Sequence, residues 1–479
     1  MKTDALAPTL VGSAPGLRSV GIIAAYAALF NVFVPALVWA LGTKLDALLR
    51  LPAAPGLRLP GLLVSAVGLG LWSWGLLWLS AAGQGLPISS LPPARLVVTG
   101  PYALFRHPIY VGFSLLVGGV GCAAGSIGPG LVAPGILGLG CWAYVASFEG
   151  PALQRRYGPA YRRARSPGHW EEAVARLWVQ LRSPIQRLAN RPVLFRLGPA
   201  IFITYGLCVA LGAFTVAFVG RAAVGSLFSP HQYVAFTLGF PLAAALGARL
   251  AALAYDPRAL LQRGLQELRA VGFVSWGGYA GALAFTLAFG RAEGISALAI
   301  LDRLLPLLFL CMVIGRVGCV SYGCCKGVAW EPGVRWTHPV SKPVRLLGER
   351  VGSVPRLPVQ LLAALAALGA AAITETVDLA HAAVGAATSL GLVWYFFTRL
   401  GIEQLRDEPR FGQPAWTRGQ WFALGGAGIS LVLILALDPE KRVISVPMPP
   451  GWLALGMASV TFAIIFVIYG LHWRRVGRW

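Results

Sequence analysis

Charged residues are scarce in this chain of 479 residues, since Asp, Glu, Lys and Arg make up 12% of it and hydrophobic residues 57%. Acids are the scarcer sign, because 18 Asp and Glu face 40 Lys and Arg, a formal net charge of +22. The basic residues lie between apolar runs, without polar arms or stacking aromatics in solvated segments, which argues against a nucleic-acid partner. The pattern instead predicts basic cytoplasmic loops that contact anionic headgroups.

Other absences narrow the class further. The seven cysteines, several of them inside apolar runs, do not suggest the framework of a secreted disulfide-rich domain. No internal repeat is visible, which disfavours a transporter built from inverted halves. The first apolar stretch is too long, and the residues before it too polar, for an ordinary cleaved signal peptide. The first span is therefore expected to remain in the protein.

Long uncharged runs dominate what is present. About 20 apolar residues cross the hydrocarbon core, and segments 19–43, 197–220 and 443–471 contain no charged residue. The uncharged run 108–148 is long enough for two spans, with a hairpin at the Gly/Pro-rich 123–130. These runs predict an all-α polytopic membrane protein with about twelve transmembrane helices in two fused membrane domains. The remaining spans are expected at 60–82, 232–253, 271–290, 297–318, 357–374, 382–399 and 419–437.

An arginine-rich segment separates the two domains. Residues 149–196 contain many arginines and few acids, which predicts a basic, partly amphipathic helical linker on the cytoplasmic surface. A second polar break, 323–356, is rich in Gly, Pro and Arg and lies within the second domain.

The stretch "GPYALFRHPIYVGF" gathers polar residues directly before an uncharged run. Proline suits the first turn of a helix, so Pro108 predicts a helix start with Arg106, His107 and Tyr110 at its mouth. A helix N-terminus beside an arginine is suited to a carboxylate or a phosphate. The alternative is that Arg106 and His107 only anchor the helix end at the membrane interface.

A partner motif, "FEGPALQRRYGPAYRRAR", follows the two spans and includes Glu149. Together the two motifs resemble the membrane-embedded methyltransferases of the isoprenylcysteine carboxyl methyltransferase group, related to phospholipid N-methyltransferases, over roughly residues 60–170. The resemblance implies S-adenosylmethionine as cofactor, with His107, Tyr110 and Glu149 lining its pocket. Glu149 would pair with the amino group or sulfonium of the cofactor, and Arg106 with its carboxylate.

Six segments of the second domain occur in a recognisable order: "AIFITYGLCVALGAF", "GARL", "GFVSWGGYAGALAF", "IGRVGC", "RLPVQL" and "YFFTRLGIEQLRDEP". Together they resemble prolipoprotein diacylglyceryl transferase over roughly residues 195–437. The resemblance implies transfer of a diacylglyceryl group from phosphatidylglycerol to a lipoprotein cysteine thiol, with release of glycerol phosphate.

The last of these segments carries its own geometry. Its polar residues are spaced by four, four and three positions, so they share one face of a helix; they are Tyr395, Arg399, Glu403 and Arg406. Charges inside a span are costly and normally face a cavity or a partner, which makes them functional candidates. The alternative is a helix end whose charges reach the interface. We expect Arg316, Tyr395 and Arg399 to be catalytic, and Tyr205, Arg249, Glu403 and Arg406 to bind lipid.

Three positions depart from the resembled family. Its "HGG" histidine, the expected proton acceptor, is Trp276 here, and two other polar positions are Cys319 and Leu357. Tryptophan cannot accept a proton, so thiol activation by the family's route is not expected. His338, in the loop "RWTHPVSKP", could replace the missing base or could be only a polar contact.

The stretch "GCVSYGCCKG" groups Cys319, Cys324 and Cys325 at the end of a span. These thiols could be metal ligands, a nucleophile, a redox pair or simply small buried side chains. No metal site is predicted, because no nearby His or Asp completes a ligand set.

The whole chain is therefore interpreted as an enzyme of the bacterial inner membrane that modifies a lipid or a lipidated acceptor. The main interpretation is an S-adenosylmethionine-dependent methyltransferase fused to a diacylglyceryl-transferase-like domain that binds phosphatidylglycerol or a related anionic lipid. The alternatives are a prolipoprotein diacylglyceryl transferase with a rewired base, or a lipid-binding or transport module. The expected parts are a methyltransferase-like domain (1–170), the linker (171–195), a diacylglyceryl-transferase-like domain (196–437) and an additional helix (438–479).

The orientation of the second domain is left open. If the linker is cytoplasmic, the second domain begins inside, whereas the resembled family begins outside. Either the domain is inverted here or one apolar run does not cross.

Overall fold

The computed structural model describes residues 28–83, 93–163, 182–225, 227–255, 274–345, 354–379, 382–407, 416–437 and 449–473, with isolated residues 21, 24, 25, 178 and 348. The chain divides into two compact units. The first comprises residues 1–141 and 153–164, and the second residues 142–152 and 165–479. Predictions on residues 1–20 and on residues 164–177 and 179–181 of the basic segment lie outside the described residues.

The first unit is built from apolar helices, with α3 packed along α5. As predicted, α5 begins at Pro108, and its N-cap is His107. It ends at Ala123, and the next helical segment starts at Gly128, which confirms the predicted hairpin. The elements are η1 (Leu29–Phe33), α2 (Val34–Leu49), η2 (Pro55–Leu57), α3 (Arg58–Gly83), α4 (Pro101–Leu104), α5 (Pro108–Ala123) and η3 (Gly128–Val132).

A continuous helical stretch follows these elements and passes from one unit to the other. Its last part bends where Gly158 has φ 53° and Pro159 follows, because proline cannot continue the helical hydrogen bonds. The stretch consists of α6 (Ala133–Tyr144), η4 (Val145–Glu149) and α7 (Gly150–Arg163).

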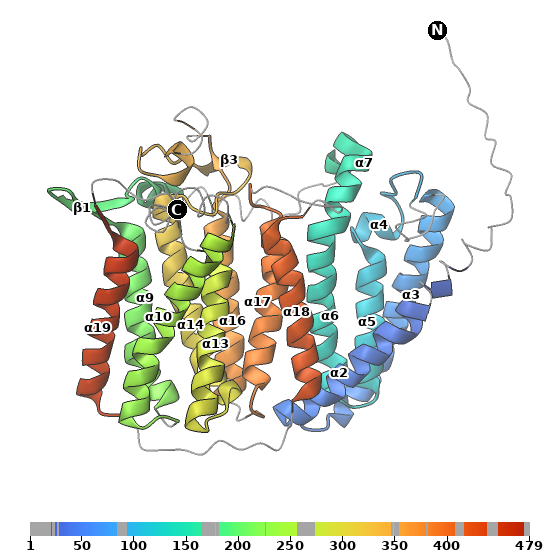
Figure 1. Ribbon diagram of the computed structural model, residues 1–479. Coiled ribbons are helices and arrows are strands. Elements are labelled where there is room, and N and C mark those ends of the chain that lie inside the picture. Colours follow the sequence, from blue (N-terminus) through green and yellow to red (C-terminus); the bar gives the residue numbers. More distant parts are fainter. Residues whose placement is uncertain are drawn as a thin grey trace, which may run out of the picture. The chain divides into compact units, whose positions relative to one another are not determined.

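The second unit is an up-and-down bundle in which neighbouring helices run in opposite directions (Figure 1). The pairs α9 and α14, α9 and α19, α10 and α13, and α17 and α18 pack side by side. Its described helices are α9 (Thr204–Val224), α10 (Pro230–Tyr255), α13 (Ser275–Glu293), α14 (Ala297–Tyr322), α16 (Val359–Leu379), α17 (Ala386–Glu403), α18 (Arg418–Ala436) and α19 (Gly451–Gly470).

A small antiparallel sheet closes one end of this bundle. Strand β2 (Ala200–Ile203) pairs with β1 (Val193–Leu197) on one side and with β4 (Leu471–Trp473) on the other. It joins the start of α9 to the end of α19, so α19 is packed into the second unit. Strand β3 (Ala329–Val334) belongs to the loop after α14 and lies at the same end (Figure 1).

The end of the basic linker also belongs to this unit. Residues 182–189 are helical, and Ile185, Leu188 and Ala189 pack against Val334 and Trp336 of the loop after α14. The helix thereby covers the loop with the apolar side that its amphipathic pattern predicts.

Local signals explain several of the helix ends. The Ser296 hydroxyl accepts a hydrogen bond from the amide of Ala299 at the start of α14, and Gly323 ends that helix in the left-handed conformation. Asp302, buried within α14, accepts hydrogen bonds from the amides of Gly385 and Thr388. It thus caps α17 across the bundle, and this buried acid has a structural role.

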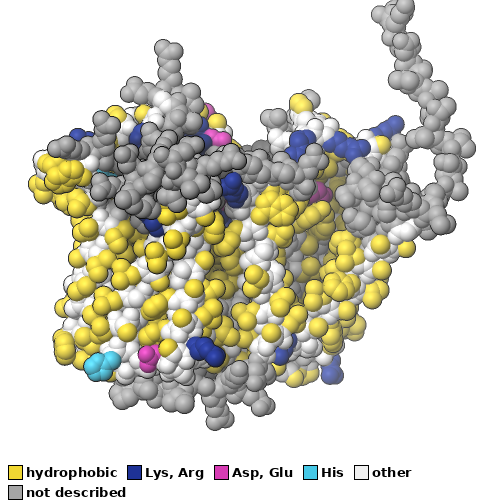
Figure 2. Space-filling view, viewed as in Figure 1, with side chains coloured by type: hydrophobic (Ala, Val, Ile, Leu, Met, Phe, Trp, Pro, Cys, Tyr) yellow, Lys and Arg dark blue, Asp and Glu magenta, His cyan; other side chains and the backbone are white. Residues whose placement is uncertain are grey.

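The all-α membrane class is confirmed. Nine helices of the described part are long and apolar enough to cross a membrane, and α5 is apolar but shorter. Helices α13 and α17 overlap the predicted spans at 271–290 and 382–399 but are not among these nine, so the described part has fewer candidate spans than the twelve predicted. Figure 2 shows hydrophobic side chains over the middle of the helices of the second unit.

We predict that Gly206→Val destabilises the second unit. A Cβ at Gly206 would lie 2.0 Å from the Cα of Gly470, so α9 and α19 could not approach as they do. Overpacking of this kind costs about 1–3 kcal/mol or more, which should lower the melting temperature in detergent. The matched control is Gly456→Val on α19, where a Cβ meets nothing within 4 Å. Equal melting temperatures for the two variants would contradict the close packing.

Candidate functional site

The polar side chains of the second unit converge at one end of the bundle. This is the end at which α9, α13 and α18 begin and at which α14 and α17 finish, next to the loop that carries β3 (Figure 1). Residues far apart in sequence therefore meet at the helix ends.

A buried carboxylate is at the centre of this group. The Oε2 atom of Glu403 lies 3.0 Å from Nη2 of Arg399 and 2.9 Å from Nη1 of Arg406. The Glu403 side chain is 3% exposed, so it is almost completely removed from solvent. The spacing of these residues predicted one helical face, but α17 ends at Glu403, and Arg406 reaches it from the turn that follows.

The first turn of α18 completes the surroundings of this carboxylate. The hydroxyl of Thr417 lies 3.4 Å from Oε1 of Glu403, and Thr417 and Gln420 form a capping box. The positive end of the helix therefore faces a negative charge, which is favourable. A Cβ at Gly419 would lie 2.5 Å from Oε1, so glycine is what lets the helix approach.

Arg316 and two tyrosines lie in the same group. Tyr279 of α13 interacts with Tyr395 of α17, and both Arg316 and Arg399 act on it electrostatically. Arg316 also donates a hydrogen bond to Sγ of Cys325 over 3.5 Å. The three residues predicted to be catalytic, Arg316, Tyr395 and Arg399, thus lie around one site.

Three thiols adjoin this group. Cys319, Cys324 and Cys325 are free, and their side chains interact with one another. Cys325 has φ 55°, a left-handed conformation that is unusual for a residue with a Cβ. The backbone there is held by Gln360, whose Nε2 donates to the carbonyl oxygen of Cys324 over 2.7 Å. The described residues contain no group of three or more side chains arranged to hold a metal ion.

The loop after α14 is tied to the end of α17 by a second ionic group. Arg356, of which 7% is exposed, donates from Nη1 to the carbonyl of Gly327 (3.1 Å) and to Oδ2 of Asp407 (2.8 Å). Lys326 also bonds Asp407 and, with Arg356, holds the pKa of that carboxyl below its ordinary value. The sequence does not predict this pairing, because contacts between two loops leave no periodic signal.

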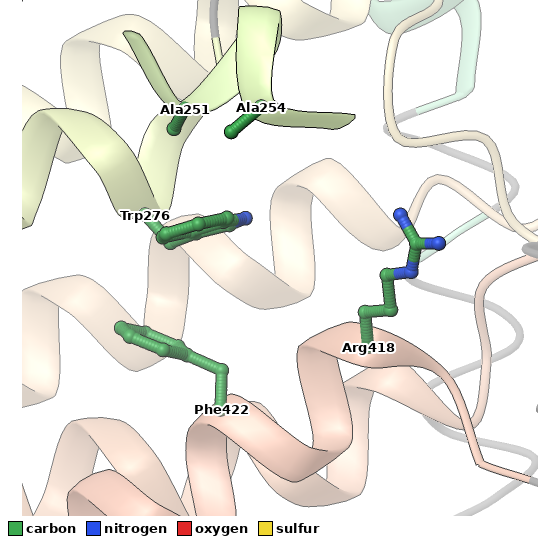
Figure 3. Close-up of a pocket in the computed structure, with 5 residues that line it drawn as sticks. All are labelled: Ala251, Ala254, Trp276, Arg418 and Phe422. Carbon is green, nitrogen blue, oxygen red and sulfur yellow. The ribbon is translucent and has the colours of Figure 1, made fainter. Parts of the chain in front are cut away.

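A cavity of about 470 Å³ opens beside the site (Figure 3). It is lined by Ala251 and Ala254 of α10, Trp276 of α13, and Arg418 and Phe422 of α18. Trp276, the replacement for the expected histidine, thus contributes its indole to an apolar wall, with one guanidinium group at the border of the cavity. Such a mixture suits an amphiphile with an anionic head.

The remaining predicted residues of this domain differ in their placement. Tyr205 of α9 lies beside the thiols, and its ring is 6.4 Å from that of Tyr322. Arg249 is two positions before Ala251, which lines the cavity. His338 accepts a hydrogen bond from the amide of Val340, and burial and Arg196 lower its pKa.

The predicted cofactor residues are divided between the two units. Arg106, His107 and Tyr110 belong to the first unit, where Arg106 lies 4.4 Å over the ring of Tyr161 and the rings of His107 and Tyr110 are 5.9 Å apart. The two motifs that suggested a methyltransferase therefore contact each other. Glu149 belongs to the second unit.

The fold and the site define a multi-pass membrane protein with a buried, arginine-rich site at one end of a helical bundle. Comparison with known proteins identifies the family. Residues 192–436 match the family model of prolipoprotein diacylglyceryl transferase, and the chain belongs to this family. It is similar to phosphatidylglycerol–prolipoprotein diacylglyceryl transferases of Solidesulfovibrio magneticus (30% identical; 52% of this chain, 96% of the relative) and Nitrosomonas europaea (28%; 50% and 88%).

These comparisons decide several predictions. The chain is a transferase, and its predicted location, a multi-pass protein of the bacterial inner membrane, is confirmed. The main functional interpretation, methyl transfer, is wrong, because the family and the relatives are diacylglyceryl transferases. Bound S-adenosylmethionine rested on the resemblance of residues 60–170, which the family match does not include, and stays a prediction.

We predict that Glu403→Gln strongly destabilises the protein. The change leaves Arg399 and Arg406 buried without their carboxylate, a loss worth about 3–5 kcal/mol. Glu331→Gln is the control, since that pair with Arg335 is half exposed or more and its loss costs less than about 1 kcal/mol. Thermal unfolding in detergent measures both, and a melting temperature unchanged by Glu403→Gln would refute the role of the carboxylate.

We also predict an acid-sensitive contribution from Asp407. Its pKa is lower in the folded state because of Lys326 and Arg356. The carboxylate therefore stabilises the fold above its ordinary pKa, and this contribution is lost as the pH falls through the lowered value. Asp407→Asn should reduce the melting temperature at neutral pH, and the difference from the wild type should shrink as the pH falls below the ordinary Asp pKa of about 3.9 and through the lowered value. A difference independent of pH would show that the charge is not responsible.

Proposed function

We propose that the protein transfers a diacylglyceryl group from phosphatidylglycerol to the cysteine thiol of a prolipoprotein and releases glycerol phosphate. The observation that carries this proposal is an excess of guanidinium groups at the site: Arg399 and Arg406 both pair with Glu403, and Arg316 lies in the same group, next to Cys325. The names of the relatives, which specify this donor and this class of acceptor, support the same reaction.

The charge of the site suits the donor lipid. Burying three guanidinium groups with one carboxylate leaves positive charge that is costly in a low-dielectric environment. The phosphodiester of phosphatidylglycerol would supply the missing anion, and arginine binds phosphate oxygens in a bidentate manner. During transfer the bond between the glyceryl carbon and the phosphate oxygen breaks, so negative charge increases on the departing glycerol phosphate. Arg316 and Arg399 would stabilise that charge as it develops.

The cavity beside the site suits the apolar part of the donor. Its volume of about 470 Å³ is within the range of ligand pockets. Trp276 and Phe422 would contact acyl chains, while Arg418 at its border would attract an anionic headgroup. A lipid could thus place its phosphate near the arginines and its chains against the aromatic wall.

The proposal is tested with the purified full chain, phosphatidylglycerol in mixed micelles and a prolipoprotein signal peptide that contains one cysteine. We expect glycerol phosphate release that depends on the peptide thiol. Arg316→Ala should lower kcat about 100-fold or more, the usual loss when a group that stabilises developing charge is removed. Arg316→Lys, which keeps the charge but not the bidentate donor geometry of the guanidinium group, should retain part of the activity.

Arg335→Ala is the control for this experiment, because Arg335 pairs with Glu331 at an exposed position. It should leave the rate unchanged. Thiol-independent release, or no release by well-folded protein, would count against the proposed reaction.

A further inference from the structure

The proposed reaction requires a proton acceptor. An acceptor thiol has an ordinary pKa of about 8.5, so at neutral pH most acceptor molecules carry a thiol proton that must be removed before the sulfur attacks. At the position of the expected histidine the chain has Trp276, whose indole has no lone pair for a proton. Another side chain of the site must therefore serve, if the transfer proceeds by deprotonation.

Most of the described ionisable groups around Arg316 are unsuited to this role. A guanidinium group offers no acceptor for a proton, and a phenol, with an ordinary pKa of about 10, is a poor acceptor in its usual protonated form. The carboxylate of Glu403 has its lone pairs directed at Arg399 and Arg406. Protonating it would break these two buried ion pairs.

The geometry points to the Cys325 thiolate as the general base for the acceptor thiol, an inference that rests on the proposed diacylglyceryl transfer. Its sulfur lies 3.5 Å from Nη1 of Arg316, which places it beside the predicted phosphate site. Two further thiols, of Cys319 and Cys324, interact with it. The site therefore surrounds this sulfur with groups that favour a negative charge.

The backbone at Cys325 supports the same assignment. Its φ of 55° is one that glycine adopts freely and that a residue with a Cβ adopts at a cost. Strained positions of this kind are maintained where the side chain has a task. A cysteine that served only to fill space could be replaced here by glycine with a gain in backbone energy.

The electrostatic environment favours the ionised form of this thiol. Hydrogen bonds from the thiols of Cys319 and Cys324, followed by the charges of Arg406 and Arg316, hold the pKa of Cys325 well below its ordinary value although burial opposes them. The geometry and the charges therefore both favour the unprotonated base. A weak base suffices, because the proton of the attacking thiol becomes much more acidic as the new carbon–sulfur bond forms.

The step balances in atoms and electrons. The acceptor S–H bond gives its proton to the Cys325 thiolate while its sulfur forms a bond to the glyceryl carbon. The carbon–oxygen bond to the phosphate breaks, and its electron pair leaves on glycerol phosphate. The proton then passes from Cys325 to the released phosphate monoester, whose second pKa of about 6 allows it to accept one. Neither an oxidant nor a metal takes part.

The first test compares kcat over pH for the wild type, Cys325→Ala and Cys325→Gly, with phosphatidylglycerol and the same peptide. Both variants should lose about 100-fold or more in kcat at neutral pH, the lower end of what a general base contributes. The loss should shrink at alkaline pH, where the acceptor thiol ionises by itself, and KM for the lipid should not change. An equal loss at every pH, or wild-type activity in Cys325→Ala, would overturn the assignment.

The two variants also control for stability. Both lack the thiol, but only alanine retains a Cβ in the left-handed conformation, so Cys325→Gly should melt at a higher temperature than Cys325→Ala. If Cys325 were only structural, the more stable Cys325→Gly variant would be more active than Cys325→Ala. Equal loss of activity in both variants therefore separates a catalytic role from a structural one. Cys208→Ala is the matched cysteine control, since Cys208 lies on α9 and its loss should leave the pH profile of kcat unchanged.

A second readout does not depend on transferase activity. Modification with methyl methanethiosulfonate, which forms a methyl disulfide on a thiolate and releases methanesulfinate, followed by peptide mass spectrometry, should show Cys325 reacting at pH 6 as readily as at about pH 8. In Arg316→Ala the reaction should shift to higher pH. Reaction of wild-type Cys325 only near the ordinary thiol pKa would overturn the inference even if diacylglyceryl transfer is observed. Modification of Cys325 at about pH 6 without any diacylglyceryl transfer would establish the thiolate and show the proposed function to be wrong.

Discussion

The ion pairs of Glu403 hold together the part of the molecule on which the site depends. One carboxylate binds Arg399 from its own helix and Arg406 from the following turn, and it receives the N-terminus of α18. The end of α17 and the start of α18 are thereby joined within a region that is almost free of water. Such a group is stable only while both signs are present, because a single charge left there would be uncompensated.

The remaining polar structure extends from this centre towards the loop after α14. Arg356 and Asp407 bind the loop to the end of α17, and the loop in turn carries the thiols past Arg316. Positive charge exceeds negative charge in this part of the bundle, while the neighbouring cavity is mostly apolar. A lipid with an anionic head meets both requirements at once, which links the family assignment to the physical chemistry of the described residues.

The methyltransferase prediction was wrong for an identifiable reason. The motif around His107 is compact and specific, whereas the motifs of the second domain are short and dispersed along the chain. Those segments carry the family match over residues 192–436. The departures at Trp276 and Cys319 also reduced the expected importance of that domain. In the structure the tryptophan lines a cavity, and the cysteine contacts the thiol of Cys325.

The sequence by itself determined the membrane class, the approximate spans and the shared face of Tyr395, Arg399 and Glu403, because hydrophobic run length and helical periodicity are local properties. It did not predict that Thr417 would meet Glu403, or that Arg316 would reach Cys325. These contacts join different helices and loops, so they depend on how the helices pack and where each one ends. Only the tertiary structure brings such side chains within bonding distance.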